Sequence, residues 1–404
     1  MTTYFVPRGF RIGAVHAGLK RNPNKPDVAL FVADEPAVAA GVYTQNLVFA
    51  APVALDRSRT PTDNFRVLVV NSGNANACTG ERGEQDARRM TQLAAAAVGA
   101  AHAESIDEAS ALVMSTGIIG HFLPMEKIES GIARAAADLG DDEAHLLLGL
   151  RGLMTTDKTQ KIACREIELD GVAVRIAGLA KGAGMIGPDM ATLLAVVLTD
   201  AKLSSEQAHA AIRDATNDSF NCISVDGHTS TNDTALLVAS GKASGKPLSQ
   251  AALGQFRQAL TELCQELAKM IPDDGEGATH LIEMQVEGCA NKEDAVRIAR
   301  TVAASPLVKC AVAGGDPNWG RIVSAAGYAG VAFDPKKVAL EINGLPIFEA
   351  GRPLPFDAKT VSTSMKENRL TRLRLVFGEG SAAARFWASD LNEEYVRFNS
   401  EYST

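Results

Sequence analysis

The sequence predicts a mixed α/β (α+β) fold in which layered sheets are flanked by helices. Short β-branched runs bordered by glycine, asparagine or proline alternate along the chain with longer alanine-rich or periodic stretches. A length of 404 residues and a hydrophobic share of 46% allow a large core divided between two or three lobes. Such alternation over this length is typical of layered α/β proteins.

Most of the strands that we predict lie in the first half of the chain. Five runs combine β-branched residues with turn-forming borders, and they are Val28–Ala33, Gly41–Thr44, Val67–Asn71, Ala111–Ser115 and Val172–Ile176. The alanine-rich segment Glu84–Ala101 has high helix propensity and separates the third run from the fourth.

Helices mark the second half. Ser204 and Gln207 have the spacing of a capping box, which predicts a helix that starts there. The clearest helix covers Ser249–Met270, because its large apolar residues recur at steps of three and four. A helix over Lys292–Ala304 and then a strand over Val338–Ile342 complete the alternation.

Composition argues against several classes of partner. A net charge of -8 provides no basic face for a nucleic-acid backbone. The six cysteines are scattered and never form a Cys-x-x-Cys pair, which disfavours a disulfide framework or a metal cluster. No segment has the roughly 18 consecutive apolar residues of a membrane span, and residues 1–20 lack the apolar core of a signal peptide. We therefore expect a cytoplasmic protein that binds neither nucleic acid nor membranes.

The stretch Lys181–Asp200 joins a glycine-rich loop to an apolar run and contains a candidate nucleophile. Small side chains flank the peptide bond between Ala191 and Thr192, so the Thr192 hydroxyl can reach the preceding carbonyl. Attack there would cut the chain and make Thr192 a new N-terminus. The freed α-amine, with an ordinary pKa of about 7.7–8.0, can act as general base for the hydroxyl beside it.

The same loop also matches a dinucleotide-binding pattern. Gly182, Gly184 and Gly187 satisfy G-x-G-x-x-G. That motif requires a helix next, whereas Pro188 and the apolar run Leu193–Leu198 predict a buried strand. Nicotinamide binding is therefore disfavoured.

Other common hydrolase patterns are missing from the sequence. The seven histidines form neither His-x-x-x-His nor His-Glu-x-x-His, which disfavours a zinc hydrolase. No Gly-x-Ser-x-Gly elbow occurs, which disfavours the common serine hydrolases. A hydroxyl nucleophile that does not depend on histidine fits what remains.

Several polar clusters could surround such a nucleophile. Ser115–Gly120 ends a strand with hydroxyls and glycines whose backbone amides could face a developing oxyanion. Asp273–Thr279 carries carboxylates that could receive a substrate ammonium, although acidic runs are usually solvated turns. Three further clusters suit a pocket wall or a plain structural loop, and they are Asn71–Ala77, Ser224–Asp233 and Gly314–Arg321.

Long motifs of this kind extend over essentially the whole chain. They are Asn71–Ala77, Ser115–Gly117, Met154–Asp157, Lys181–Ile186 with Met190–Thr192, Val225–Thr234, Gly275–Thr279, Asp316–Arg321 and the tail Asn399–Thr404. Together they resemble the glutamate/ornithine N-acetyltransferase family of the arginine pathway. The length and number of these motifs make the resemblance more specific than any single motif.

The resemblance implies a self-cleaving, threonine-nucleophile acetyltransferase fold. Cleavage between Ala191 and Thr192 would give an α chain of residues 1–191 and a β chain of residues 192–404, which assemble as an α2β2 heterotetramer. It also implies a ping-pong acyltransferase in which Thr192 takes acetyl from N2-acetylornithine, releases ornithine and passes the acetyl group to glutamate. Neither a metal nor an organic cofactor is implied.

Site residues follow from the resemblance position by position. Thr116 and Gly117 would stabilise the oxyanion. The substrate-binding residues would be Thr155, Lys181, Thr192, Glu276, Asn399 and Thr404. The chemistry agrees, since a lysine can pair with a substrate carboxylate and an acid with the side-chain ammonium of ornithine.

Three positions depart from the family pattern. Ala183 stands where serine is common, Asp189 where asparagine is common, and Lys158 where threonine usually continues the Met154–Asp157 motif. Because of the last change, Thr155 and Thr156 are both candidates for the substrate contact, and Thr155 is favoured.

Two other functions remain in competition, and one question stays open. An aminopeptidase-like hydrolase of related self-cleaving architecture would let water reach the acyl-threonine. A catalytically silent binding protein for amino acids would never acquire an acetyl group. Acetyl-CoA as an additional donor is left open, because the family contains both types and no phosphate-cradling loop is evident.

Overall fold

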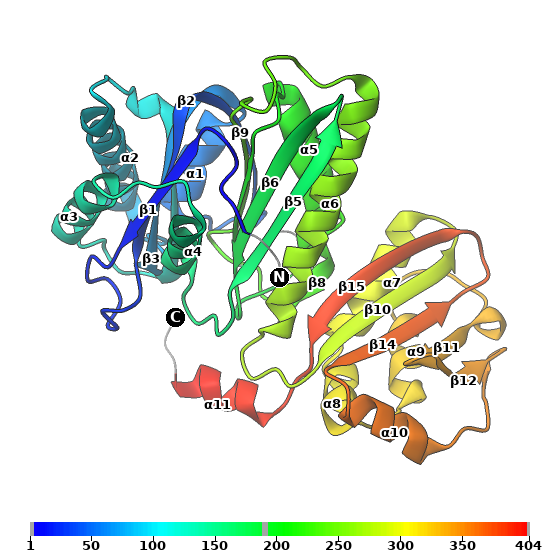
Figure 1. The fold of residues 1–404 in the computed structure, drawn as a ribbon. Coiled ribbons are helices and arrows are strands. Elements are labelled where there is room, and N and C mark those ends of the chain that lie inside the picture. Colours follow the sequence, from blue (N-terminus) through cyan, green and yellow to red (C-terminus); the bar gives the residue numbers. More distant parts are fainter. Residues whose placement is uncertain (1–3, 188–192, 402–404) are drawn as a thin grey trace.

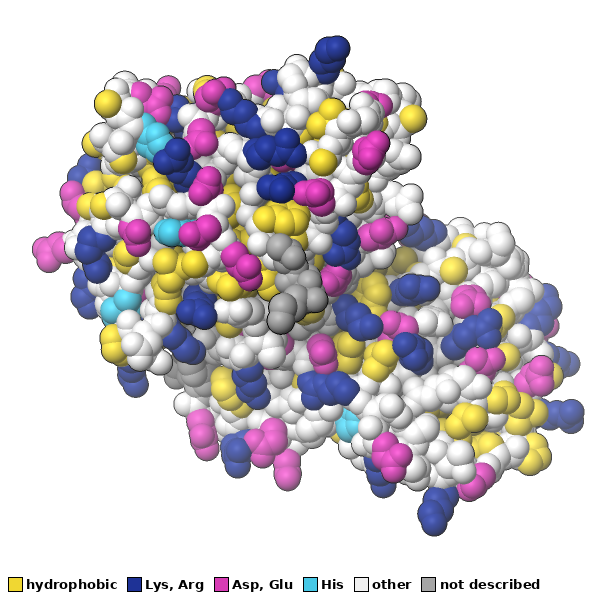
Figure 2. Space-filling view, viewed as in Figure 1, with side chains coloured by type: hydrophobic (Ala, Val, Ile, Leu, Met, Phe, Trp, Pro, Cys, Tyr) yellow, Lys and Arg dark blue, Asp and Glu magenta, His cyan; other side chains and the backbone are white. Residues whose placement is uncertain are grey.

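The computed structural model describes residues 4–187 and 193–401, which form two lobes, each built around one sheet (Figure 1). The predicted cleavage residues Ala191 and Thr192, the neighbouring Asp189 and the terminal Thr404 lie outside the described residues. Acidic and basic side chains are interspersed over the face shown in Figure 2. No helix in the described ranges is long and apolar enough to cross a membrane.

The first sheet has eight strands in the order β4-β3-β2-β9-β7-β6-β5, with β1 paired to β2. Its strands are β1 Phe10–Val15, β2 Val28–Tyr43, β3 Thr62–Asn74, β4 Ala111–Ile118, β5 Lys161–Leu169, β6 Val172–Lys181, β7 Leu194–Thr199 and β9 Thr234–Ala239. The central strands β7 and β9 are buried along their whole length, which explains their unbroken apolar sequences.

Six helices cover the faces of this sheet, and they are α1 Ala51–Arg59, α2 Gly80–His102, α3 Met125–Ala136, α4 Glu143–Leu153, α5 Ser205–Asn217 and α6 Gln250–Asp273. Successive side chains of β2 enter different cores, as the period of a strand requires. Ala29 and Phe31 pack in the core that contains α4, whereas Leu30 and Val32 pack with α2 and α3. Helices α5 and α6 cover the β5 to β9 part of the sheet.

Most of the elements expected in the first half and centre of the chain are confirmed. The runs predicted at Val28–Ala33 and Gly41–Thr44 are two parts of the single strand β2. Ser204 and Gln207 form both bonds of a capping box at the start of α5. The predicted periodic helix is α6. The apolar run after the glycine-rich loop is strand β7, whereas a pyrophosphate site would need a helix there.

The second lobe contains a seven-stranded sheet in the order β13-β12-β11-β14-β10-β15-β8. Its strands are β8 Ile223–Ser224, β10 Leu281–Cys289, β11 Ala339–Ile342, β12 Leu345–Glu349, β13 Arg352–Pro353, β14 Leu370–Val376 and β15 Ala382–Ser389. The helices after α6 are α7 Lys292–Ala304, α8 Pro306–Gly314, α9 Trp319–Gly327, α10 Ala358–Lys366 and α11 Glu393–Glu401. Helix α7 and strand β11 confirm the helix and strand predicted there.

Strand ends of the first sheet meet at one edge and position the polar motifs. Strands β3 and β4 run parallel and end together, with Ser72 opposite Thr116. Strand β6 ends at Lys181 opposite Leu194, the first residue of β7, and Leu194 lies opposite Thr234 at the start of β9. Helix α11 returns from the second lobe to this edge (Figure 1).

Candidate active site

A cavity of about 300 Å³ lies at this edge of the first sheet. Residues from at least six separate segments line it, and they are Ala75, Thr116, Gly117, Ile119, Thr155, Thr156, Lys181, Ala183, Gly184, Met185, Asp226, His228, Ser230, Thr231, Asn232, Glu276, Tyr395 and Asn399. All the described residues that the sequence placed in the site are among them. The structure therefore brings the predicted site residues together, apart from Thr192 and Thr404, which lie outside the described residues.

One end of the cavity carries the predicted oxyanion residues. Thr116 is buried, and Gly117 adopts a φ of 136°, a backbone conformation that favours glycine. Gly117 also lies against Gly73 of the neighbouring strand, so that an added Cβ would come within 2.3 Å of the Gly73 carbonyl carbon. The side-chain amide of Asn232 donates to the Ser115 and Ala75 carbonyls at 2.9 and 2.7 Å and fixes this end to the start of β9.

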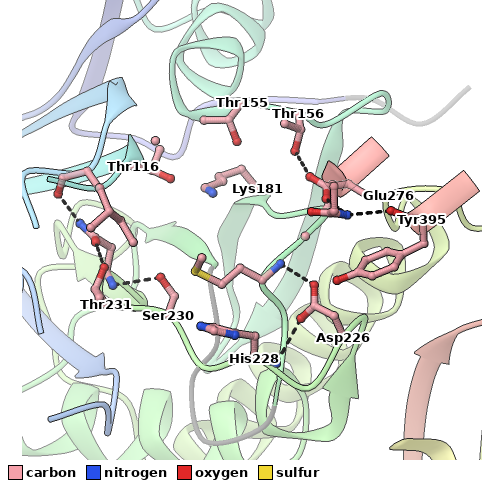
Figure 3. Close-up of a pocket in the computed structure, with 18 residues that line it drawn as sticks. Thr116, Thr155, Thr156, Lys181, Asp226, His228, Ser230, Thr231, Glu276 and Tyr395 are labelled. Atoms are coloured by element: carbon pink, nitrogen blue, oxygen red, sulfur yellow. Dashed lines mark hydrogen bonds between the residues drawn. The ribbon is translucent and has the colours of Figure 1, made fainter. Parts of the chain in front are cut away.

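Lys181 lies between the two ends of the cavity (Figure 3). Its side chain is only 2% exposed, and its ammonium makes no hydrogen bond to another described residue. Burial lowers the pKa of Lys181, while the charges of Asp157 and Asp233 oppose that shift. A buried cation that faces a cavity and has no hydrogen-bond partner among the described residues is suited to binding the carboxylate of a ligand.

A buried ion triad lies directly behind this lysine. The ammonium of Lys161, which is fully buried, donates to Asp157 Oδ1 at 2.7 Å and to Asp274 Oδ2 at 2.6 Å. Asp157 also accepts the backbone N–H groups of Gly182 and Thr155, at 2.7 and 2.9 Å. The triad thus ties together the glycine-rich loop, the turn after α4 and the loop after α6.

Removing the cation of this triad should strongly destabilise the fold. Replacing Lys161 with Met leaves two buried carboxylates without their shared partner, so we expect the free energy of unfolding to fall by about 3–5 kcal/mol. Replacing Lys292, whose exposed side chain pairs with Asp218, with Met should cost less than about 1 kcal/mol. Denaturant unfolding of both variants checks this, and equal losses would show that the triad has no special weight.

Glu276 forms the other end of the cavity with residues of two other segments (Figure 3). Its Oε1 accepts the Thr156 hydroxyl at 2.8 Å, and its Oε2 accepts the Asn399 amide at 3.2 Å. The side chain is 8% exposed, and burial raises the pKa of Glu276. The acidic run after α6 is therefore no solvated turn, because Asp274 is held in the ion triad and Glu276 faces the cavity.

The structure distinguishes Thr155 from Thr156 without excluding either. Both line the cavity, but the Thr156 hydroxyl is bonded to Glu276, whereas the Thr155 hydroxyl makes no hydrogen bond to another described residue. Thr155 is thus the one with an uncommitted hydroxyl, and it stays the favoured substrate contact. The backbone N–H of Lys158 donates to Asp274, and its exposed side chain is not part of the cavity wall.

Sequence reasoning did not single out Asp226 and Tyr395, which also line the cavity. Asp226 accepts the backbone N–H groups of Met185 and Ile186 at 2.7 and 2.9 Å, and so holds the glycine-rich loop just before the segment 188–192. Burial raises the pKa of Tyr395, and the negative charge of Asp226 raises it further. Their only sequence signal is membership of longer motifs or of the C-terminal segment.

A second carboxylate holds the chain just after the predicted cleavage site. The backbone N–H of Leu193 donates to Asp233 Oδ1 at 3.0 Å, and the Leu193 carbonyl accepts from Thr234. Asp233 is fully buried, and its Oδ2 has no hydrogen-bond partner among the described residues. Burial raises the pKa of the side chain well above its usual range. The residue that follows Thr192 is thereby fixed at the edge of the first sheet.

One predicted wall segment does not belong to the cavity. Gly314–Arg321 lies in the second lobe, where Asn318 accepts from the Arg321 backbone N–H to cap α9 and Trp319 stacks on Phe348. Its polar residues shape a turn between two helices, so of the two alternatives for this segment the structural loop is confirmed and the pocket wall is not. Of Asn71–Ala77 only Ala75 lines the cavity, whereas the Ser224–Asp233 segment contributes five lining residues, from Asp226 to Asn232.

Within the described residues, no group of three histidine, cysteine or acidic side chains could hold a metal ion. The cavity instead offers a hydroxyl and a glycine with positive φ at one end, a carboxylate at the other, and an ammonium between them. Such a cavity suits a small substrate that carries both a carboxylate and a positive charge.

The chain belongs to the ArgJ family, since the family model matches residues 11–404. The arginine biosynthesis bifunctional protein ArgJ of Rhodopirellula baltica is 49% identical over 406 residues, which cover 100% of this chain and 97% of that protein. A crystal structure of the ArgJ protein of Bacillus halodurans is 36% identical, with a TM-score of 0.50, and covers 51% of this chain and 98% of its own. An ornithine acetyltransferase from Mycobacterium tuberculosis, solved with ornithine, is 31% identical over 48% of this chain and 96% of its own, with a TM-score of 0.41. The family match and the Rhodopirellula relative place the protein among the acyltransferases. It is an acyltransferase of arginine biosynthesis.

Proposed function

We propose that this chain moves an acetyl group from N2-acetylornithine to glutamate through an ester on Thr192. The observation that carries the proposal is the buried Lys181 ammonium, which faces the cavity between Thr116 and Gly117 at one end and Glu276 at the other. An α-carboxylate bound at Lys181 would direct the acylated α-nitrogen toward the hydroxyl end and the ornithine side chain toward Glu276.

The proposed chemistry begins with self-cleavage. The Thr192 hydroxyl attacks the Ala191 carbonyl and displaces its own amide nitrogen, which gives an ester and a free α-amine. Water then hydrolyses the ester, so residues 1–191 end in a carboxylate and Thr192 becomes an N-terminus. The free amine can take the hydroxyl proton in the next reaction.

Acetyl transfer then follows in two half-reactions. The Thr192 hydroxyl attacks the acetyl carbonyl of N2-acetylornithine, Thr116 and Gly117 stabilise the oxyanion, and ornithine leaves with the proton. Glutamate enters the emptied cavity, and its α-amine attacks the ester to give N-acetylglutamate and the free hydroxyl. The scheme needs no metal or organic cofactor, because the hydroxyl, the amine and the oxyanion donors belong to the chain.

Strand pairing supports continued association of the two fragments. Strands β2 and β6 of residues 1–191 pair with β9 and β7 of residues 192–404 inside one sheet. Separating the fragments would expose these paired and buried strands to water. We therefore propose that the fragments stay together. We also propose that two such pairs form an α2β2 heterotetramer, as the family resemblance implies, and that the enzyme works in the cytoplasm.

Dependence on the acceptor separates the acetyltransferase from the hydrolase. With N2-acetylornithine as donor, sustained ornithine release should require glutamate, and N-acetylglutamate should form in equal amount. An aminopeptidase-like enzyme would release ornithine equally without glutamate. Equal rates of ornithine release with and without glutamate would therefore refute the proposal. The absence of ornithine release when glutamate is present would refute it as well.

The word bifunctional in the name of the Rhodopirellula relative supports a second activity. Acetyl-CoA is the second donor we propose. Formation of N-acetylglutamate from acetyl-CoA and glutamate alone would establish it, and its absence under conditions that support transfer from N2-acetylornithine would make the chain monofunctional.

A further inference from the structure

The end of the cavity around Glu276 must accept two opposite charges, if the proposed function holds. In a ping-pong reaction both amino acids place their α-groups at the same positions. The side-chain nitrogen of ornithine and the side-chain oxygens of glutamate are separated from Cα by the same number of bonds. An ammonium and a carboxylate therefore reach the same place in turn.

The described residues at this end offer no cation for the carboxylate. Among the described side chains that line the cavity, Lys181 is the only lysine and none is an arginine, and Lys181 lies between the two ends rather than at Glu276 (Figure 3). The charged and titratable side chains that line the cavity with Glu276, among the described residues, are Lys181, Asp226, His228 and Tyr395. Asp226 is already the acceptor of backbone N–H groups from Met185, Ile186 and His228.

Two carboxylates at contact distance cannot both stay ionised, and a shared proton is the usual solution. We propose that Glu276 selects between the two substrates by its protonation state: ionised, it binds the ammonium of N2-acetylornithine or ornithine, and protonated, it donates a hydrogen bond to the side-chain carboxylate of glutamate. One proton enters from solvent when glutamate binds and returns to solvent when ornithine takes its place.

The neighbours of Glu276 suit both states. The Thr156 hydroxyl donates to Oε1 of the ionised carboxylate, and it can keep donating to the carbonyl oxygen of the protonated acid while the acid O–H donates to the ligand. The Asn399 amide, which donates to Oε2 at 3.2 Å, can donate to the carboxylate of a ligand instead. Burial raises the pKa of Glu276 and so brings the protonated form closer to neutral pH.

Isotope exchange measures each half-reaction separately. Labelled ornithine enters N2-acetylornithine, and labelled glutamate enters N-acetylglutamate, each without the other pair. Both exchanges depend on pH through the Thr192 amine and through the α-amine of the labelled amino acid. The ratio of the two rates removes this shared pH dependence. Ornithine exchange needs ionised Glu276 and should fall as the pH drops through the raised pKa, whereas glutamate exchange should fall as the pH rises through it. The ratio of ornithine to glutamate exchange should therefore increase with pH.

The variant Glu276→Gln mimics the protonated acid permanently. Ornithine exchange should fall by at least about 30-fold, which corresponds to losing one partner of a buried charge pair, while glutamate exchange stays within about 3-fold. The ratio should no longer vary with pH. Glu276→Asp, which still titrates, should keep a pH-dependent ratio. Glu287→Gln, at an ion pair with Arg374 in the second lobe, should leave both exchanges unchanged.

The outcomes separate this inference from the proposed function. If wild-type enzyme catalyses neither exchange, the acetyltransfer mechanism itself is wrong. If it catalyses both, but Glu276→Gln lowers them equally or the wild-type ratio is independent of pH, the protonation switch is wrong while the mechanism stands. Thermal unfolding of each variant identifies a loss that is due to misfolding, and Glu276→Asp then decides the question.

Discussion

Replacing Thr192 with alanine is expected to leave the chain uncut and inactive. Without the hydroxyl there is no attack on the Ala191 carbonyl, no new N-terminus and no acetyl ester. Loss of a catalytic nucleophile can reduce turnover by about 10⁶-fold, so we expect a drop of at least about 10⁴-fold in ornithine release. A denaturing gel should show one full-length band in place of two fragments.

The variant should still fold, because strands β6 and β7, on either side of the cleavage site, pair with each other over six residue pairs. Thr192→Ser is the matched control, since it keeps a hydroxyl at the same position. It should be cleaved and should retain measurable transfer. An uncut Thr192→Ala chain that transfers acetyl groups at the wild-type rate would remove Thr192 from the mechanism.

Gly117→Ala is expected to have the second largest effect. Its Cβ would lie within 2.3 Å of the Gly73 carbonyl carbon and 2.4 Å of the Asn74 backbone nitrogen, so the ends of β3 and β4 must separate. Its φ of 136° is also unfavourable for alanine. Because this displacement would move the proposed oxyanion donor, kcat should fall by about 10²- to 10³-fold, as when one such donor is lost.

Gly120 provides the matched control for this substitution. It lies three residues further along the same segment with a φ of 81°, and an added Cβ would meet nothing within 4 Å. Gly120→Ala should therefore show only the backbone strain, a loss of about 1–3 kcal/mol in stability, with kcat close to wild type. If both substitutions reduce kcat equally, strain in the segment rather than the position of Gly117 explains the loss.

Local sequence patterns were sufficient to predict many of the helices and strands. In α6 the apolar residues recur every three or four positions, and in β7 they form a nearly continuous run. Both patterns result from burial, so the sequence alone predicts the two elements. The two runs of β2 were predicted as separate strands, because the acidic residues and proline between them look like a break. In the structure one strand contains Pro36, within a stretch where the pairing with β3 shifts register.

Site residues that belong to a distinctive sequence motif could be predicted. Residues whose role depends on contacts between distant segments could not. Lys181 and Glu276 stand in glycine-rich segments, so their types and surroundings were informative. Lys161 begins a strand with no distinctive neighbours, and its role emerges only when Asp157 and Asp274, from distant segments, meet at its ammonium. Gly314–Arg321 had a composition as suggestive as Ser224–Asp233, yet only the latter reaches the cavity. Composition alone does not say which loops meet.

The most direct test of the mechanism is to find the acetyl group on the chain. Wild-type protein is incubated with N2-acetylornithine alone, quenched in acid and digested, and its peptides are examined by mass spectrometry. We predict one acetyl ester on a peptide whose first residue is Thr192, and its disappearance after a brief chase with glutamate. A protein that makes N-acetylglutamate while its Thr192 is still joined to Ala191, or never carries acetyl, would contradict the account.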